Sequence, residues 1–190
     1  EKGIGQKQSN KSLTRPQQEK RSATSTIYVD YAGLILIAPF LPTYFGALDL
    51  LKEEQFVSQF AREKAVHLLY FLATGKEKPS EPETLFFKFL CGLPFQFPIQ
   101  KELDLTDTEK MEGEHLLTSA ISHWKKLKKT SVNGLREGFF RREGKLIVEK
   151  EHYKLIVEQR GVDVLLGYLP WRISTIKLPW LEDSIRVDWA

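Results

Sequence analysis

The stretch that decides the fold is Gly134-Leu-Arg-Glu-Gly-Phe-Phe-Arg-Arg-Glu-Gly-Lys145, which runs on through two β-type segments to Leu178-Pro-Trp180 and Trp189. A short amphipathic segment, two β-branched runs and three tryptophans follow one another there with few polar linkers. Aromatic side chains bury roughly 150–250 Å² each and dominate the energetics of a core. We therefore expect the core in this last third of the chain.

The two β-type runs predict a hairpin. Leu146–Glu149 and Lys154–Glu158 are near copies, and they are separated only by the polar residues 150–153. Two apolar β-branched runs joined by a short polar linker offer each other a ladder partner at little loop cost. The following segment, Gly161–Gly167, is long enough for one or two helical turns and is ended by Gly167 and Pro170.

A Leu-Pro-Trp repeat follows this segment. Leu169-Pro-Trp171 recurs as Leu178-Pro-Trp180, and Trp189 comes at the same nine-residue step. Each proline fixes φ and ends a helix or a ladder, so each Pro-Trp predicts a rigid bend that presents a large aromatic. Two interpretations stay open: the tryptophans pack inward as core, or one of them anchors a partner.

These residues resemble the C-terminal region of contractile injection system tape measure proteins. The resemblance is carried by Gly134–Leu146, Val162–Leu166 and Leu169–Trp180, and further blocks lie upstream at Tyr28–Pro42, Ala61–Leu69 and Leu90–Pro94. It covers roughly residues 27–189, in order, and leaves out the first 26.

The resemblance implies a structural protein of a phage-tail-like machine and not an enzyme. Such a protein sets the length of the inner tube, and its C-terminal domain is expected to anchor to the baseplate hub and spike. The implied partners are hub, spike and inner tube proteins, with several copies around a symmetry axis; the implied location is the cytoplasm during assembly and then the lumen of the particle. The candidate partner-binding residues are Trp171, Trp180, Trp189, Phe139 and Arg136.

Composition divides the chain into two parts. Residues 1–26 are rich in Gln, Ser, Lys and Thr, hold six of the basic residues against two acidic ones, and lack the apolar side chains that offset ordering entropy. We expect a disordered or extended basic tail there and one folded domain over residues 27–190. The tail carries a charge of +4 and the whole chain a charge of +3, so the domain has a charge of −1. A nearly neutral body is weak evidence for a nucleic-acid binder, which uses a basic stripe.

The domain is expected to be α+β, with two longer helices, short helices and the C-terminal hairpin. Either one buried strand or two short ones are predicted over Ile27–Asp30 and Gly33–Ala38. Helices are predicted at Tyr44–Leu51, Glu53–Thr74 and Thr84–Leu90. A second long helix starts at the capping box Thr106-Asp-Thr-Glu109. Its predicted inward stripe is Leu117, Ala120, Ile121 and Trp124, and the lysines at its C-terminal end are Lys125, Lys126, Lys128 and Lys129.

No motif marks an enzyme, a cofactor or a metal. The single cysteine, Cys91, predicts no intrachain disulfide and is best interpreted as a buried apolar residue. His67 lacks partners at ligand spacing, and Glu112 and His115 form only one copy of a di-iron-type pair, so no metal is expected. The longest apolar run, about ten residues, falls short of the roughly 20 that span a bilayer. The chain begins without methionine, which predicts a piece of a longer protein.

Two alternatives to the structural role remain at this point. One is a soluble adaptor that binds an unrelated partner through exposed aromatics. The other is a nucleic-acid binder that uses the basic tail, and such a complex weakens steeply as salt rises.

Overall fold

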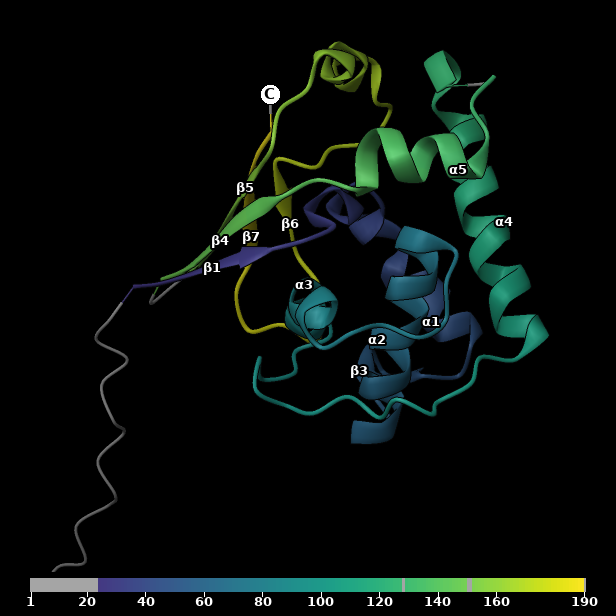
Figure 1. Cartoon of the computed structure of the whole chain (residues 1–190), viewed down its shortest axis with the longest axis vertical. Helices are drawn as coiled ribbons and strands as arrows, with labels where there is room; N and C mark the ends of the chain where they lie inside the picture. The colour runs from purple at the N-terminus through teal and green to yellow at the C-terminus, as the bar shows by residue number, and fades with distance from the viewer. Residues whose placement is uncertain (1–23, 128, 150–151, 190) are drawn as a thin grey trace, which may run out of the picture.

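The computed structural model describes residues 24–127, 129–149 and 152–189, and shows an α+β fold (Figure 1). The prediction of a tail falls mostly on residues 1–23, which lie outside the described ranges. The elements are β1 (Ser25–Val29), η1 (Ala32–Phe40), α1 (Leu41–Ala47), β2 (Leu51–Lys52), β3 (Gln55–Phe56), α2 (Gln59–Thr74), η2 (Pro82–Thr84), α3 (Leu85–Leu90), α4 (Asp107–His123), η3 (Lys125–Leu127), α5 (Val132–Leu135), η4 (Arg136–Phe140), β4 (Gly144–Val148), β5 (Tyr153–Val157), η5 (Gly161–Tyr168), β6 (Thr175–Ile176) and β7 (Ile185–Asp188).

A five-stranded sheet forms one layer of the fold, in the order β1-β4-β5-β7-β6. The β4–β5 hairpin is confirmed, with Leu146 opposite Leu155. β1 pairs antiparallel with β4, whereas β5 and β7 are parallel and are joined by a connection that contains η5 and β6. Leu146, Leu155 and Ile185 are fully buried on the inner face of this sheet. The helices α1 to α4 all lie on that side (Figure 1).

The centre of the core is η1 and not the last third of the chain, because most of the buried apolar residues lie before residue 134. The strand prediction for Gly33–Ala38 is wrong as well. Residues 32–38 form part of a 3₁₀-helix and are buried on every side. A short run without polar residues has no period that separates a buried strand from a buried helix. Gly33 is required at this place because a Cβ there would lie 1.7 Å from the Phe139 carbonyl oxygen, so η1 and η4 approach backbone to backbone.

The two long helices occur as expected, with one shifted start. α2 ends at Thr74 and is capped by Gly75 at φ 73°, as the sequence predicts. It begins at Gln59 rather than Glu53, because the Ser58 hydroxyl caps it by accepting from the Ala61 amide at 3.0 Å. The capping box of α4 is confirmed, and all four residues of its stripe are buried. α3 confirms the short helix predicted before Cys91.

The segment between η1 and α2 differs most from the prediction. Pro42 lies in the first turn of α1, where its missing amide costs nothing, so the helix spans Leu41–Ala47 instead of Tyr44–Leu51. Leu51 instead starts the small β2–β3 hairpin. The hairpin turns through Glu53 and Glu54, whose φ angles of 49° and 63° are left-handed. Such angles favour glycine, and the sequence carries no glycine to signal this turn.

Within the described ranges, none of the helices combines the length and the apolar character needed to cross a bilayer.

Candidate partner-binding site

Arg136, a candidate partner-binding residue, joins three helices from inside the protein. Its side chain is 7% exposed. The Nε atom donates to the Leu72 carbonyl at 3.0 Å, and Nη2 donates to the Phe71 carbonyl at 3.3 Å and to Glu114 Oε1 at 2.6 Å. These carbonyls belong to the last turn of α2, where the Phe71 carbonyl also accepts from the Gly75 amide and the negative end of the helix dipole attracts a cation. Arg136 therefore holds the end of α2 against α4 and η4.

A second buried arginine, Arg142, lies just after the other end of η4. Its guanidinium binds both oxygens of Asp163, at 2.7 and 3.1 Å, and donates to the Gly138 and Glu158 carbonyls. The Trp189 indole also donates to Asp163, at 3.1 Å. Burial alone would raise the pKa of Asp163, but these hydrogen bonds bring that pKa below its usual value. Asp163 is thus a carboxylate held charged inside the protein, where it ties η4, η5 and the C-terminal strand region together.

Three of the candidate aromatics are also core residues. Trp180 is 7% exposed, donates to the Leu90 carbonyl at 2.8 Å and packs against Phe45 and Phe56. Trp189 is buried and donates to Asp163. Phe139 is buried against Trp124, with ring centroids 4.9 Å apart. The interpretation of core tryptophans therefore holds for Trp180 and Trp189. Trp189 and Trp171 also line an open hollow of about 500 Å³, whereas Trp180, Phe139 and Arg136 are shielded within the core. The role of all these residues in binding stays a prediction.

Trp171 is the candidate residue that reaches the surface, and it is held rigidly. Its indole donates to the Leu36 carbonyl at 2.8 Å. Its ring meets Phe40 edge to face at 5.0 Å and Trp124 at 6.3 Å. The ring is partly exposed. A fixed and partly exposed tryptophan of this kind loses little freedom on binding, which is the property of an anchor residue.

An apolar groove of about 310 Å³ lies beside this ring, and we call it the Trp171 groove. It is lined by Phe40, Leu116, Ser119, Ala120, His123, Pro170 and Trp171. These residues come from the end of η1, from the exposed side of α4 and from the bend after η5. The sequence marked Trp171 and not the rest, because residues so far apart in the chain meet only in the fold.

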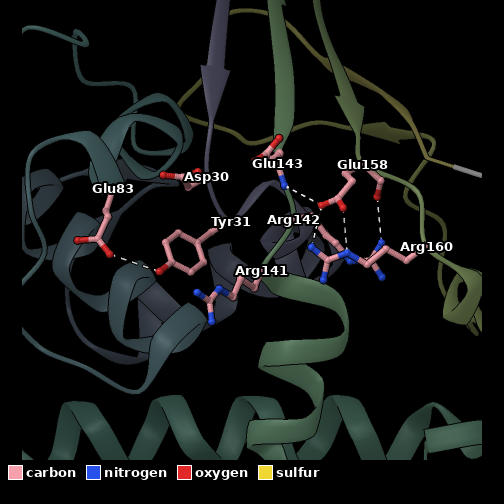
Figure 2. A pocket seen from close by; sticks show the side chains of 8 residues that line it. All are labelled: Asp30, Tyr31, Glu83, Arg141, Arg142, Glu143, Glu158 and Arg160. Atoms are coloured by element: carbon pink, nitrogen blue, oxygen red, sulfur yellow. Dashed lines mark hydrogen bonds and ion pairs between the residues drawn. The ribbon is translucent and has the colours of Figure 1, made fainter.

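A second hollow, of about 430 Å³, is charged (Figure 2). It is lined by Asp30, Tyr31, Glu83, Arg141, Arg142, Glu143, Glu158 and Arg160. Its arginines are already paired: Arg141 with Glu137, Arg142 with Asp163 and Arg160 with Glu158. Tyr31 donates to Glu83 at 3.3 Å, and burial together with this carboxylate raises the pKa of Tyr31 to about 12. These pairings join neighbouring segments of the fold, and their arrangement is not that of a nucleophile with its base.

The other polar residues singled out in the sequence do not gather into a site. Among the described residues, no group of three His, Cys, Asp or Glu side chains is placed to hold a metal ion. Cys91 is fully buried, and burial raises the pKa of its thiol. His67 is buried too, and neither ring nitrogen has a well-formed hydrogen bond to a described residue. Lys125, Lys126 and Lys129 are exposed, whereas Lys128 lies outside the described residues.

The described residues form an α+β module with an internal charged framework and an apolar groove beside Trp171. The family model of the contractile injection system tape measure protein matches residues 2–189, and the chain belongs to this family. The match includes nearly all of the first 26 residues, so leaving them out of the resemblance was wrong. No curated protein and no solved structure matches the chain.

Membership gives the coarse function. The family is one of structural tape measure proteins, which lie inside the tube of the injection particle and associate with tube and baseplate components.

Proposed function

We propose that this chain is the C-terminal anchoring region of a tape measure protein, and that it ties the length-setting part of that protein to the baseplate hub or spike. In this role it assembles in the cytoplasm, remains in the lumen of the particle and is present in several copies around the symmetry axis of the hub. Trp171 and its groove are the surface on which the hub or spike docks.

The observation that supports an anchor over a ruler is the size of the helices. The longest described helix, α4, has 17 residues, which corresponds to about 26 Å at 1.5 Å per residue. The remaining described elements fold back around η1 (Figure 1). A region built in this way adds little length as it gains residues, whereas an extended helix grows linearly with its residue count. The described region is therefore suited to holding a position.

The Trp171 groove supports docking by its chemistry. It combines a rigid aromatic with an apolar floor and a polar rim, which is the pattern of a binding hot spot. Exposed lysines follow α4 at positions 125, 126 and 129, and Lys126 lies 4.5 Å from the centre of the Tyr168 ring. A hub surface with an apolar projection bordered by acidic residues would complement this region.

The test fills the groove without touching the core. Ser119 is exposed on α4 and lines the groove, so Ser119→Arg should place a long charged side chain where the partner docks. Ser122→Arg is the matched control, because Ser122 is exposed on the same helix but does not line the groove. Binding is measured by pull-down with the hub and spike proteins of the same system. We expect Ser119→Arg to weaken capture at least about tenfold and Ser122→Arg to leave it unchanged.

Equal capture of both variants would exclude the groove as the docking surface. If the wild-type protein captures no hub, spike or tube protein, the anchoring role itself is contradicted and a soluble adaptor for another partner is favoured.

A further inference from the structure

The two edges of the five-stranded sheet are unequal. One edge is β6, which has only two residues. The other edge is β1, with five residues from Ser25 to Val29 (Figure 1). An edge strand presents unpaired amides and carbonyls, and very short strands are one way in which proteins protect such an edge. The β6 edge has this protection and the β1 edge does not.

The register shows which main-chain groups of β1 point outward. The Glu149 amide donates to the His152 carbonyl, and the Glu158 amide donates to the Glu143 carbonyl. The main-chain groups of the odd-numbered residues of β4 therefore point toward β5. Its even-numbered residues therefore face β1, where Gly144 and Leu146 stand opposite Val29 and Ile27. It follows that the amides and carbonyls of Thr26 and Tyr28 point away from the sheet. No hydrogen bond joins these groups to any other described residue.

The side chains of β1 also lack the usual protection. The strand reads Ser-Thr-Ile-Tyr-Val, with no charge, no proline and no bulge against β4. Tyr28 is 74% exposed on the outer face of the sheet. An uncharged, β-branched and regular edge is a template for another strand. The composition of β1 therefore indicates an edge that is covered when the protein works.

The strand is self-complementary about a two-fold axis. If two copies of β1 run antiparallel with Ile27 opposite Ile27, each Tyr28 faces the Thr26 of the other copy. Aromatic and β-branched residues form favourable cross-strand pairs. Asp30 then stands opposite Thr24, so no like charges face each other across the axis.

The residues before β1 are poor candidates to cover this edge. Residues 1–23 hold only Ile4 and Thr14 as β-branched residues, hold no aromatic residue and include Pro16. Such a sequence has little tendency to form a strand. A second copy of β1 offers what this segment lacks.

We propose that β1 is a self-association edge through which two copies of this chain pair antiparallel around Ile27 and continue the sheet from one copy into the other. This proposal does not depend on anchoring to the hub, because it rests on the sheet alone. It adds a two-fold contact to the surfaces of the module.

Proline at Thr26 tests the edge directly. The Thr26 amide points outward, so Thr26→Pro removes no hydrogen bond within the sheet but places a ring where the second copy would accept one. Thr26→Ala is the matched control, because it keeps the amide and loses only the side chain. Mass is measured by light scattering on the full chain, and melting temperature is measured in parallel. We expect wild type and Thr26→Ala to be dimers, and Thr26→Pro to dissociate at least about tenfold more readily at an unchanged melting temperature.

Cysteine cross-linking tests the register and does not rely on proline. In the proposed pairing Ile27 forms a non-hydrogen-bonded pair with its copy, whose Cα atoms lie about 4.5 Å apart and suit a disulfide. Ile27→Cys should therefore give a covalent dimer under mild oxidation, with Cys91 protected by burial. Ser25→Cys should not, since the two copies of Ser25 would lie about 13 Å or more apart.

Three results would overturn the proposal. The first is a wild-type protein that stays monomeric up to about 100 µM, which excludes an interface of micromolar strength. The second is a Thr26→Pro variant as dimeric as wild type, which places the interface elsewhere. The third is a dimer that forms only after residues 1–23 are removed, which assigns the edge to that segment.

Discussion

The buried ion pair between Arg142 and Asp163 allows the strongest prediction about the fold. Asp163→Asn keeps the shape of the side chain and removes its charge, so the Arg142 guanidinium, with a side chain 0% exposed, is left without a counter-charge. Removing one partner of a buried pair costs about 3–5 kcal/mol, because the remaining charge stays desolvated. For a chain of this size each kcal/mol lowers the melting temperature by about 2–4 °C, so the total decrease should be about 6–20 °C.

The matched control, Glu158, lines the charged hollow together with Arg142 (Figure 2). Glu158 pairs with Arg160 at 2.8 Å, but these side chains are 37% and 42% exposed. Glu158→Gln makes the same change in charge and shape at this screened pair, where about 0–1 kcal/mol is expected. Both variants are unfolded in urea while tryptophan fluorescence is followed. Equal losses from the two variants, or a loss below about 1 kcal/mol for Asp163→Asn, would refute the view that Arg142 and Asp163 hold the core together.

Three further predictions concern single residues. Burial lowers the pKa of His67, so the folded protein favours the neutral ring. The stability that this ring contributes is complete above the unfolded-state pKa of about 6.5 and is lost as the pH falls below that value. Urea titrations at several pH values should show this loss in wild type and a smaller loss in His67→Leu. Trp180→Ala should cost about 3–5 kcal/mol in the same assay, since the indole packs against Phe45 and Phe56, and a loss under 1 kcal/mol would mean that this part of the core is loose. Glu54→Gly should raise stability by about 0.5–1 kcal/mol because φ is 63° there, whereas Glu54→Ala, which keeps a Cβ, should bring no gain.

The parts of the fold that follow from local pattern could be predicted from the sequence. The β4–β5 hairpin is signalled by two near-identical runs, and α4 is signalled by its capping box at Thr106 and Glu109. The 3₁₀-helix η1 could not be recognised, because residues 33–38 are buried on all sides and lack the periodicity that separates helix from strand. The turn at Glu53 and Glu54 was hidden for a different reason, since its left-handed residues are not glycines.

The candidate site could be predicted only in part. Large aromatics such as Trp180 were recognised as important, but their size does not tell whether they face the core or a partner. Arg136 is charged, yet the acceptors that allow its burial are carbonyls of α2, which lie more than 60 residues away in sequence. The Trp171 groove joins Phe40, Leu116 and Trp171, and such long-range contacts leave no local signal.

The most direct test of the anchoring role is to delete residues 27–190 from the complete tape measure protein and to measure the number and length of the tubes that assemble. If this region is an anchor, electron micrographs should show few tubes, or tubes of uncontrolled length, because assembly starts poorly at the baseplate. If the region instead served as ruler, the tubes would form in normal numbers and be about 250 Å shorter, at 1.5 Å for each deleted residue. Uniform tubes of that reduced length, or normal numbers of tubes at the wild-type length, would contradict the anchoring role.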